Sequence, residues 1–141
     1  MSKVAVVFWS GTGNTQAMAE AVAEGAKNAG AEVDLLNSDE FGAAKMAEYD
    51  AVGFGCPSMG TEQLEESSFE PMFTECESKL SGKRIALFGS FGWGDGQWMR
   101  DWESRCDDAG ASMVCDYVIC NETPNDVGLE SCRAMGAALA K

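Results

Sequence analysis

Two periods of apolar residues alternate along this chain. Short apolar runs predict β-strands over residues 3–9, 31–36, 50–55, 83–89 and 112–120. Segments with apolar residues three and four positions apart predict helices over residues 14–29, 39–47, 66–80, 96–109 and 125–140, of which 39–47 is the weakest. Strand and helix therefore follow one another from end to end, which is typical of repeated βαβ units.

This alternation predicts an α/β fold in which a doubly wound, five-stranded parallel sheet is covered by helices on both faces. We find no internal repeat, linker or low-complexity segment, so residues 1–141 are expected to form a single domain. Trp98 and Trp102 are spaced to share one helix face, and we assign them to the core. Pro71 fits its predicted helix only in the first turn.

In open parallel sheets, ligands bind at the carboxyl ends of the strands. Three loops there carry candidate chemistry. The first is Ser10-Gly11-Thr12-Gly13-Asn14-Thr15, between a strand and a helix. Its glycines let backbone amides point inward, its hydroxyls add donors, and the helix N-terminus favours negative charge. It lacks the lysine of a P-loop and the third glycine of a dinucleotide site, so it predicts a site for a terminal monophosphate. A simple capped helix start would look similar.

The second loop is Cys56-Pro57-Ser58-Met59-Gly60-Thr61-Glu62, where Gly60 can adopt positive φ and Glu62 can accept from a ring N–H. The third, residues 89–96, holds four glycines around Ser90, Phe91 and Trp93. A tryptophan between two glycines is well placed to cover a flat ligand. Taken singly, each loop also fits an ordinary surface turn.

The net charge of −13 lies entirely after residue 30, because residues 1–30 contain two lysines and two glutamates. Such a surface repels nucleic acid and anionic membranes and attracts a basic protein partner. No segment reaches the roughly 18 apolar residues of a membrane span, and the first apolar run is too short for a secretory signal. We therefore expect a cytoplasmic protein.

The six cysteines contain no Cys-x-x-Cys pair, and the chain has no histidine. These absences argue against zinc and iron–sulfur sites and against Ser-His or Cys-His hydrolysis. We interpret the cysteines as mostly small, reduced core residues.

With these motifs in this order and spacing, the whole chain resembles the short-chain flavodoxins. The resemblance rests on Trp9-Ser-Gly-Thr-Gly-Asn-Thr15, on Gly55-Cys-Pro-Ser-Met-Gly-Thr-Glu62 and on Leu87-Phe-Gly-Ser-Phe-Gly-Trp-Gly94. The fifth-strand region lacks the insertion that separates the long-chain type. The resemblance implies strand order 2-1-3-4-5 and FMN as the ligand.

It also implies roles for individual residues. Ser10, Gly11, Thr12, Gly13, Asn14 and Thr15 would hold the phosphate. Pro57, Ser58, Met59, Gly60, Thr61 and Glu62 would line one side and edge of the isoalloxazine ring. Ser90, Phe91, Gly92, Trp93 and Gly94 would line the other, with Trp93 stacked on the ring. Asn121 would lie near the ribityl chain. Phe91 stands where relatives carry tyrosine, and Thr61 varies within the family, so no hydroxyl role is expected of either.

The function implied is a low-potential one-electron carrier and not an enzyme. We expect the Met59 carbonyl, in a peptide that Gly60 lets turn, to accept a new ring N–H after one-electron reduction. Glu62 and the acidic chain would disfavour a second negative charge. The acidic residues Glu62, Glu65, Glu66, Glu70 and Asp95 would dock basic redox enzymes, with side chains at 65 and 66 facing solvent.

Two alternatives stay open at this point. A small NAD(P)H- or quinone-dependent flavin reductase on the same scaffold would need a second nucleotide site. A flavin-free phosphate-binding domain would purify colourless. The default oligomeric state is a monomer.

Overall fold

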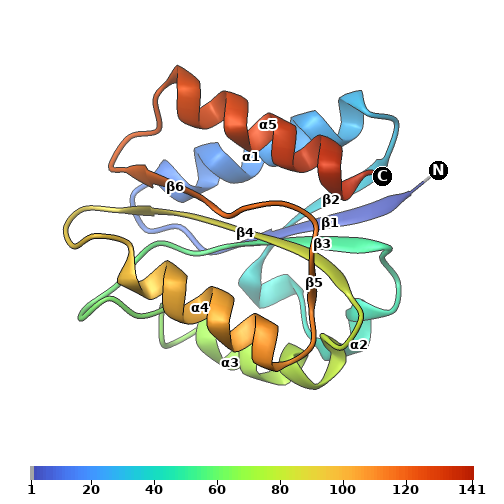
Figure 1. Cartoon of the computed structure of the whole chain (residues 1–141), viewed down its shortest axis with the longest axis horizontal. Coiled ribbons are helices and arrows are strands. Elements are labelled where there is room, and N and C mark those ends of the chain that lie inside the picture. Colours follow the sequence, from blue (N-terminus) through green and yellow to red (C-terminus); the bar gives the residue numbers. More distant parts are fainter. Residues whose placement is uncertain (1) are drawn as a thin grey trace.

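A six-stranded parallel sheet runs through the centre of the computed structural model, which describes residues 2–141 (Figure 1). Its strands are β1 (Lys3–Phe8), β2 (Glu32–Asn37), β3 (Ala51–Gly55), β4 (Arg84–Phe91), β5 (Ser112–Met113) and β6 (Val118–Asn121). Their order is β2-β1-β3-β4-β5, with β6 also paired to β4. The predicted order 2-1-3-4-5 is confirmed, and β5 and β6 are two pieces of the predicted fifth strand.

The two pieces meet different parts of β4. Arg84 and Ile85 pair with β5, whereas Phe88–Phe91 pair with β6. The chain between them leaves the ladder at residues 114–117, where Asp116 is exposed and aspartate is disfavoured in strands. The second piece carries the chain to the ligand-binding edge of the sheet.

Helices cover both faces of the sheet. α1 (Asn14–Asn28) and α5 (Asp126–Leu139) lie on one face, and α3 (Phe69–Cys76) and α4 (Gln97–Asp108) lie on the other (Figure 1). α1 and α5 touch backbone to backbone, since a Cβ on Gly25 would stand 2.0 Å from the Arg133 carbonyl oxygen and one on Gly136 2.0 Å from that of Val22. This close crossing fixes the position of α1, whose N-terminus opens onto the carboxyl edge of the sheet.

Two apolar layers fill the space between sheet and helices. The layer under α3 and α4 holds Phe54, Phe69, Phe73, Trp98 and Trp102. Both tryptophans are only 2 % exposed, so their assignment to the core is confirmed. The layer under α1 and α5 contains more alanine and valine, among them Val22 and Ala26, together with Met18 and Phe88. Five of the six cysteines are buried, and all six are free thiols.

Three predicted elements have different bounds in the structure. The helix predicted over 39–47 is a 3₁₀ turn, η1 (Ser38–Glu40), followed by the short α2 (Ala43–Met46), with Phe41 and Gly42 extended between them. The helix predicted over 66–80 begins only at Phe69, so Pro71 lies in its first turn as required, and it ends in a 3₁₀ turn, η2 (Glu77–Lys79). β4 continues two residues beyond the predicted end, to Phe91.

Candidate functional site

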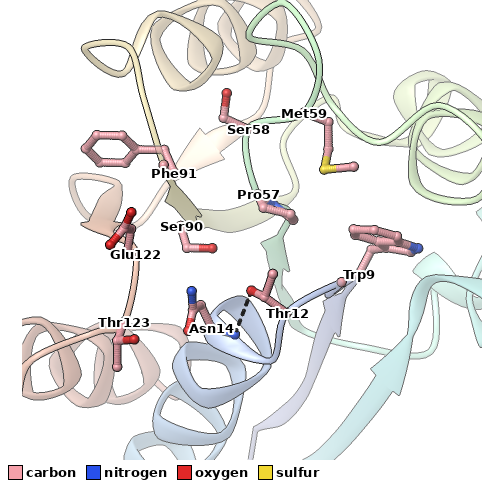
Figure 2. Close-up of a pocket in the computed structure, with 12 residues that line it drawn as sticks. Trp9, Thr12, Asn14, Pro57, Ser58, Met59, Ser90, Phe91, Glu122 and Thr123 are labelled. Carbon is pink, nitrogen blue, oxygen red and sulfur yellow. Dashed lines mark hydrogen bonds between the residues drawn. The ribbon is translucent and has the colours of Figure 1, made fainter.

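A cavity of about 660 Å³ opens at the carboxyl edge of the sheet, within the size range of small-molecule sites. Four segments line it and surround one space in Figure 2: the loop after β1, the loop after β3, the end of β4 and the loop after β6. The lining residues are Trp9, Gly11, Thr12, Asn14, Pro57, Ser58, Met59, Ser90, Phe91, Gly92, Glu122 and Thr123.

The loop after β1 organises hydrogen-bond donors at the α1 N-terminus. The Ser10 hydroxyl accepts from the amides of Gly13 (3.1 Å) and Gln16 (3.3 Å), and the Thr12 hydroxyl accepts from the Asn14 amide (3.5 Å). Gly13 precedes the helix with φ of 95°, where no side chain caps the helix. These backbone amides now donate to neutral hydroxyl oxygens. The same amides could donate to an anion bound at the helix N-terminus.

Thr15 and Ser90 join this loop to β4. Their hydroxyls lie 2.7 Å apart, and the Ser90 amide also donates to the Thr15 oxygen. Both residues are buried. The Thr15 hydroxyl therefore holds the loop against the sheet, while Ser90 forms part of the cavity wall.

The loop after β3 makes a tight hairpin. Met59 and Gln63 exchange backbone hydrogen bonds of 2.8 and 3.0 Å. Gly60 has φ of 54° as predicted, and Glu62 has φ of 55°, which is uncommon outside glycine. The Ser58 amide donates to the Ser90 carbonyl, so this loop is also fixed to β4.

Glu62 carries a buried acceptor without a partner. No donor within residues 2–141 reaches its Oε1 atom, which is sealed from solvent. The third loop covers this oxygen, because a Cβ on Gly94 would stand 2.0 Å from it. A buried, unpaired carboxylate oxygen is costly unless a ligand supplies a donor. Glu62 does not line the cavity but borders a smaller pocket with Trp98, Trp102 and Arg105.

The third loop is open and glycine-rich beyond Phe91. Phe91 packs against Trp98 with ring centroids 5.6 Å apart. Trp93 is 63 % exposed and does not line the cavity. Gly94 and Gly96 both have positive φ, at 86° and 92°. The Phe91 carbonyl accepts from the Asn121 side chain (3.3 Å) and from the Glu122 amide (2.7 Å), which ties the last loop to the end of β4.

The structure brings half of the eighteen predicted site residues into the cavity wall. They are Gly11, Thr12, Asn14, Pro57, Ser58, Met59, Ser90, Phe91 and Gly92. The other half do not line it, although each lies in or next to one of the same four segments: Ser10, Gly13, Thr15, Gly60, Thr61, Glu62, Trp93, Gly94 and Asn121.

Three lining residues were not among the predicted ones. Trp9 ends the first apolar run, directly before the predicted phosphate loop, and Figure 2 shows it near Met59 and Pro57. Glu122, with φ of 55°, and Thr123 follow β6. The rule that ligands bind beyond every strand's carboxyl end could have found all three, because the fourth loop obeys it too.

The prediction that Glu65 faces solvent is wrong. Its side chain is buried and accepts hydrogen bonds from the Ser67, Ser68 and Phe69 amides, each 2.8 Å long. Glu70 is also engaged, since both of its oxygens accept from Arg105 at 2.8 and 2.7 Å. Glu66 and Asp95 are exposed as expected.

The electrostatics of the cavity are unusual for an anion site. None of its lining residues is basic, and its only charged one is Glu122. No group of three potential metal ligands occurs among residues 2–141, and no helix in that range is long and apolar enough to cross a bilayer. The cavity has the amide and hydroxyl groups of the first loop at one end, and Trp9, Met59 and Phe91 in its walls, while the unpaired Glu62 carboxylate lies outside its lining. This arrangement fits FMN, which has a phosphate, an apolar ring face and ring N–H donors.

Comparisons with known proteins agree with the geometry. The flavodoxin family model matches residues 6–136. The chain is 43 % identical to a flavodoxin of Megasphaera elsdenii over 138 residues, which is 98 % of both chains. It is 42 % identical to a flavodoxin of Clostridium beijerinckii over 135 residues, 96 % of this chain and 97 % of the other.

Solved structures give the same result. The solution structure of two-electron reduced Megasphaera elsdenii flavodoxin superimposes with a TM-score of 0.89, covering 97 % of this chain and 98 % of that one. A flavodoxin from the domain Archaea, 26 % identical, superimposes with a TM-score of 0.84. The chain therefore belongs to the flavodoxin family, whose members are FMN-binding electron carriers and not enzymes.

Proposed function

We propose that this chain carries one electron at a time, at low potential, between redox enzymes, with FMN held in the cavity at the carboxyl edge of the sheet. The observation that carries the assignment of the site is a cavity lined by the apolar side chains of Trp9, Met59 and Phe91, which reaches the amide and hydroxyl groups of the first loop at the α1 N-terminus. The phosphate would reach the donors of the first loop, and a flavin ring N–H would satisfy the unpaired Oε1 of Glu62 if the third loop, which covers it in this structure, moves aside on binding.

The phosphate would replace the Ser10 hydroxyl as acceptor of the Gly13 and Gln16 amides. Thr12 and Asn14 already line the cavity, while Gly11 lies against the Trp9 ring, where a Cβ would stand 3.0 Å from it. Gly11 therefore keeps the loop close to Trp9. The helix dipole and neutral donors would supply the attraction, in the absence of a basic lining residue.

The ring would lie between the second and third loops. Pro57, Ser58 and Met59 form one wall, and Ser90, Phe91 and Gly92 form the other. We assign Trp93 to the outer ring face, since the glycines on both sides allow its exposed side chain to fold over the ligand. Asn121 holds the Phe91 carbonyl and so supports the wall near the ribityl chain.

When bound, FMN supplies the electron chemistry, and the chain tunes it. The Met59 carbonyl accepts from the Gln63 amide at 3.0 Å in this structure, so it would have to share or give up that bond to accept a new ring proton. No donor within residues 2–141 bonds the Gly60 carbonyl. We assign that carbonyl, in the Gly60–Thr61 peptide, the role of holding the proton at the ring edge.

Glu62 would oppose accumulation of a second negative charge on the ligand. Its carboxylate lies in a water-poor position under Gly94, where screening is weak. An anaerobic redox titration of Glu62→Gln should therefore give a less negative second potential with the first less affected. An unchanged second potential at high and low salt would contradict the role of Glu62.

The cofactor assignment is tested by reconstitution. The FMN-free chain should bind FMN with quenched flavin fluorescence, riboflavin much more weakly and FAD poorly, because only FMN places a terminal phosphate in the first loop. Equal affinity for riboflavin and FMN would contradict the phosphate site. Rapid flavin reduction on stopped-flow mixing with NADH or NADPH would favour the reductase alternative over the carrier.

We also propose that the acidic face over α3 and α4 docks basic redox partners, with the chain acting as a monomer. α3 and α4 carry six acidic residues against two arginines, whereas α1 and α5 carry four against one lysine and one arginine. Glu66 and Asp95 lie on the loops that flank the ring edge and are exposed. This charge asymmetry favours approach of a basic partner from the α3–α4 side.

Salt dependence tests the docking face. Electron transfer from a basic reductase should slow as ionic strength rises above about 0.1 M, where the screening length is about 10 Å. The double variant Glu66→Lys/Asp95→Lys should slow this electron transfer further at low salt. The double variant Glu20→Lys/Glu130→Lys makes the same change in net charge on the opposite face and should slow it less. Equal rates for the two double variants would refute the assignment of this face.

A further inference from the structure

Glu65 lies at the base of the hairpin that carries Gly60 and Glu62. Its carboxylate accepts more hydrogen bonds than is usual for a glutamate, a residue type that is mostly exposed. One carboxylate oxygen accepts from the Ser67 amide (2.8 Å) and the Ser67 hydroxyl, and the other from the Ser68 and Phe69 amides (both 2.8 Å). The residue is 5 % exposed. Four donors from one turn therefore converge on one carboxylate.

These contacts replace the ordinary cap of α3. Ser68 precedes the helix, but its side chain makes no capping hydrogen bond. Its hydroxyl is committed elsewhere, to the Ser38 hydroxyl (2.6 Å) and to Asp39 in η1. A carboxylate at a helix N-terminus satisfies the free amides and complements the helix dipole. Glu65 performs this function from four residues before the helix begins.

The main chain of Glu65 ties the same residue to the flavin loop. Its amide donates to the Cys56 thiol sulfur at 3.4 Å. Cys56 is itself fixed, because its amide donates to the Phe88 carbonyl (3.1 Å) and its carbonyl accepts from the Trp98 indole (3.3 Å). Residues 57–64 thus form a closed loop whose two ends meet at the Glu65–Cys56 contact.

The loop closed in this way contains the two positive-φ residues of the hairpin, Gly60 and Glu62. The Met59–Gln63 backbone hydrogen bonds and a long one from the Thr61 hydroxyl to the Gln63 side chain (3.5 Å) hold its tip together. The end at Ser58 is anchored to β4 by its amide, and the end at Gln63 continues directly into Leu64 and Glu65. An uncommon backbone conformation persists only when its surroundings hold it in place. The second anchor of the hairpin is therefore the α3 N-terminus, through Glu65.

We propose that Glu65 is a positioning residue of the electron-carrier site: its carboxylate locks the α3 N-terminus to the base of the 57–64 loop and thereby sets the conformation of the Gly60–Glu62 turn. It does not touch the cofactor. Burial alone would raise the pKa of Glu65, but the hydrogen bonds from Ser67, Phe69 and Ser68 outweigh it and hold this pKa below its ordinary value. The carboxylate is therefore ionised, and acts as a pure acceptor, at neutral pH.

This inference rests on the proposed site, and Glu75 provides a matched control. Glu75 also caps a helix from a distance, because its Oε1 accepts from the Ala43 amide of α2 at 2.8 Å. Glu65→Gln and Glu75→Gln each remove one negative charge and weaken one remote cap. Only the first touches the loop that bears Gly60 and Glu62. A glutamine at 65 keeps the shape, but its NH₂ group cannot accept from backbone amides.

The test measures amide hydrogen exchange and redox potentials for both variants. In Glu65→Gln, exchange of the Met59 and Gln63 amides should accelerate at least tenfold together with that of Phe69, with and without FMN. The gap between the two flavin potentials should narrow, and the Kd for FMN should rise about tenfold. Glu75→Gln should lower the melting temperature without changing exchange at Met59 and Gln63, either potential or the Kd.

Faster exchange confined to α3, with unchanged potentials and Kd in Glu65→Gln, would overturn the proposal and leave Glu65 as a helix cap only. If the glutamine variant folds poorly, Glu65→Asp replaces it, because aspartate keeps the charge but has a shorter side chain. Faster exchange confined to α3, with unchanged potentials and Kd, would overturn the proposal in this variant too. Failure of the unaltered chain to bind FMN would instead defeat the proposed site. The exchange comparison in the flavin-free chain would still decide whether Glu65 positions the loop.

Discussion

Gly94→Ala probes the contact between the two loops that meet over the Glu62 carboxylate. Gly94 has φ of 86°, and a Cβ there would stand 2.0 Å from Glu62 Oε1 and 2.7 Å from its Cδ. The alanine therefore meets two separate obstacles. Its backbone conformation is disfavoured for any L-residue with a Cβ, and its methyl group occupies the position of the carboxylate.

The two obstacles have different magnitudes and different readouts. Alanine at positive φ costs roughly 1–2 kcal/mol, which should appear as a lower free energy of unfolding in the FMN-free chain. Displacing Glu62 should remove a charge-assisted hydrogen bond to the ligand, worth about 1.5–3 kcal/mol. That loss corresponds to roughly 10- to 150-fold weaker FMN binding, since each 1.4 kcal/mol is about tenfold.

Urea unfolding of the FMN-free chain and a fluorescence-quenching titration with FMN separate the two effects. Gly82→Ala is the matched control for backbone strain, because its φ of 73° is also positive and a Cβ there would meet no atom within 4 Å. It should lower the free energy of unfolding by a similar amount but leave FMN affinity unchanged, since Gly82 does not line the cavity. FMN affinity in Gly94→Ala within a factor of two of the unaltered chain would refute the reasoning that Glu62 must occupy this position to bind the cofactor.

Three further predictions follow from burial and charge. Trp98→Ala should lower the free energy of unfolding by roughly 3–5 kcal/mol in urea titrations, because the ring is 2 % exposed and its indole N–H holds the Cys56 carbonyl. Trp93→Ala should leave unfolding within about 0.5 kcal/mol but weaken FMN binding by roughly 1–3 kcal/mol if the ring stacks as proposed; unchanged affinity would contradict stacking. Burial tends to raise the pKa of Glu70, but hydrogen bonds from Arg105 and Thr74 hold it below its ordinary value. The stabilisation of the fold by ionised Glu70 should therefore be complete above the ordinary glutamate pKa of about 4.3. It should be lost as pH falls through the lower pKa of Glu70 in the folded chain. Acid unfolding followed by circular dichroism should show a shallower loss in Glu70→Gln, and identical curves would rule out this contribution.

Local sequence was enough to locate most helices and strands, because their apolar periods reflect which face is buried. The periods of residues 3–9 and 14–29 correspond to β1 and α1 with small shifts at their ends. The i, i+4 spacing of Trp98 and Trp102 identified a buried face, and Gly60 was correctly given positive φ. The three loops beyond β1, β3 and β4 were identified from residue types alone, since glycine, hydroxyl and amide side chains are rarely clustered without a role at strand ends.

Tertiary contacts decided the rest. Glu65 looked like one of several exposed acids, and only the structure shows that the turn leading into α3 brings four donors, from residues 67–69, onto its carboxylate. The Met59 carbonyl looked free, and only the hairpin pairs it with Gln63. Trp9, Glu122 and Thr123 joined the cavity wall because the sheet brings distant strand ends together. Local sequence encodes backbone preference and the buried face of each element, whereas hydrogen-bond partners depend on which segments meet across the folded chain.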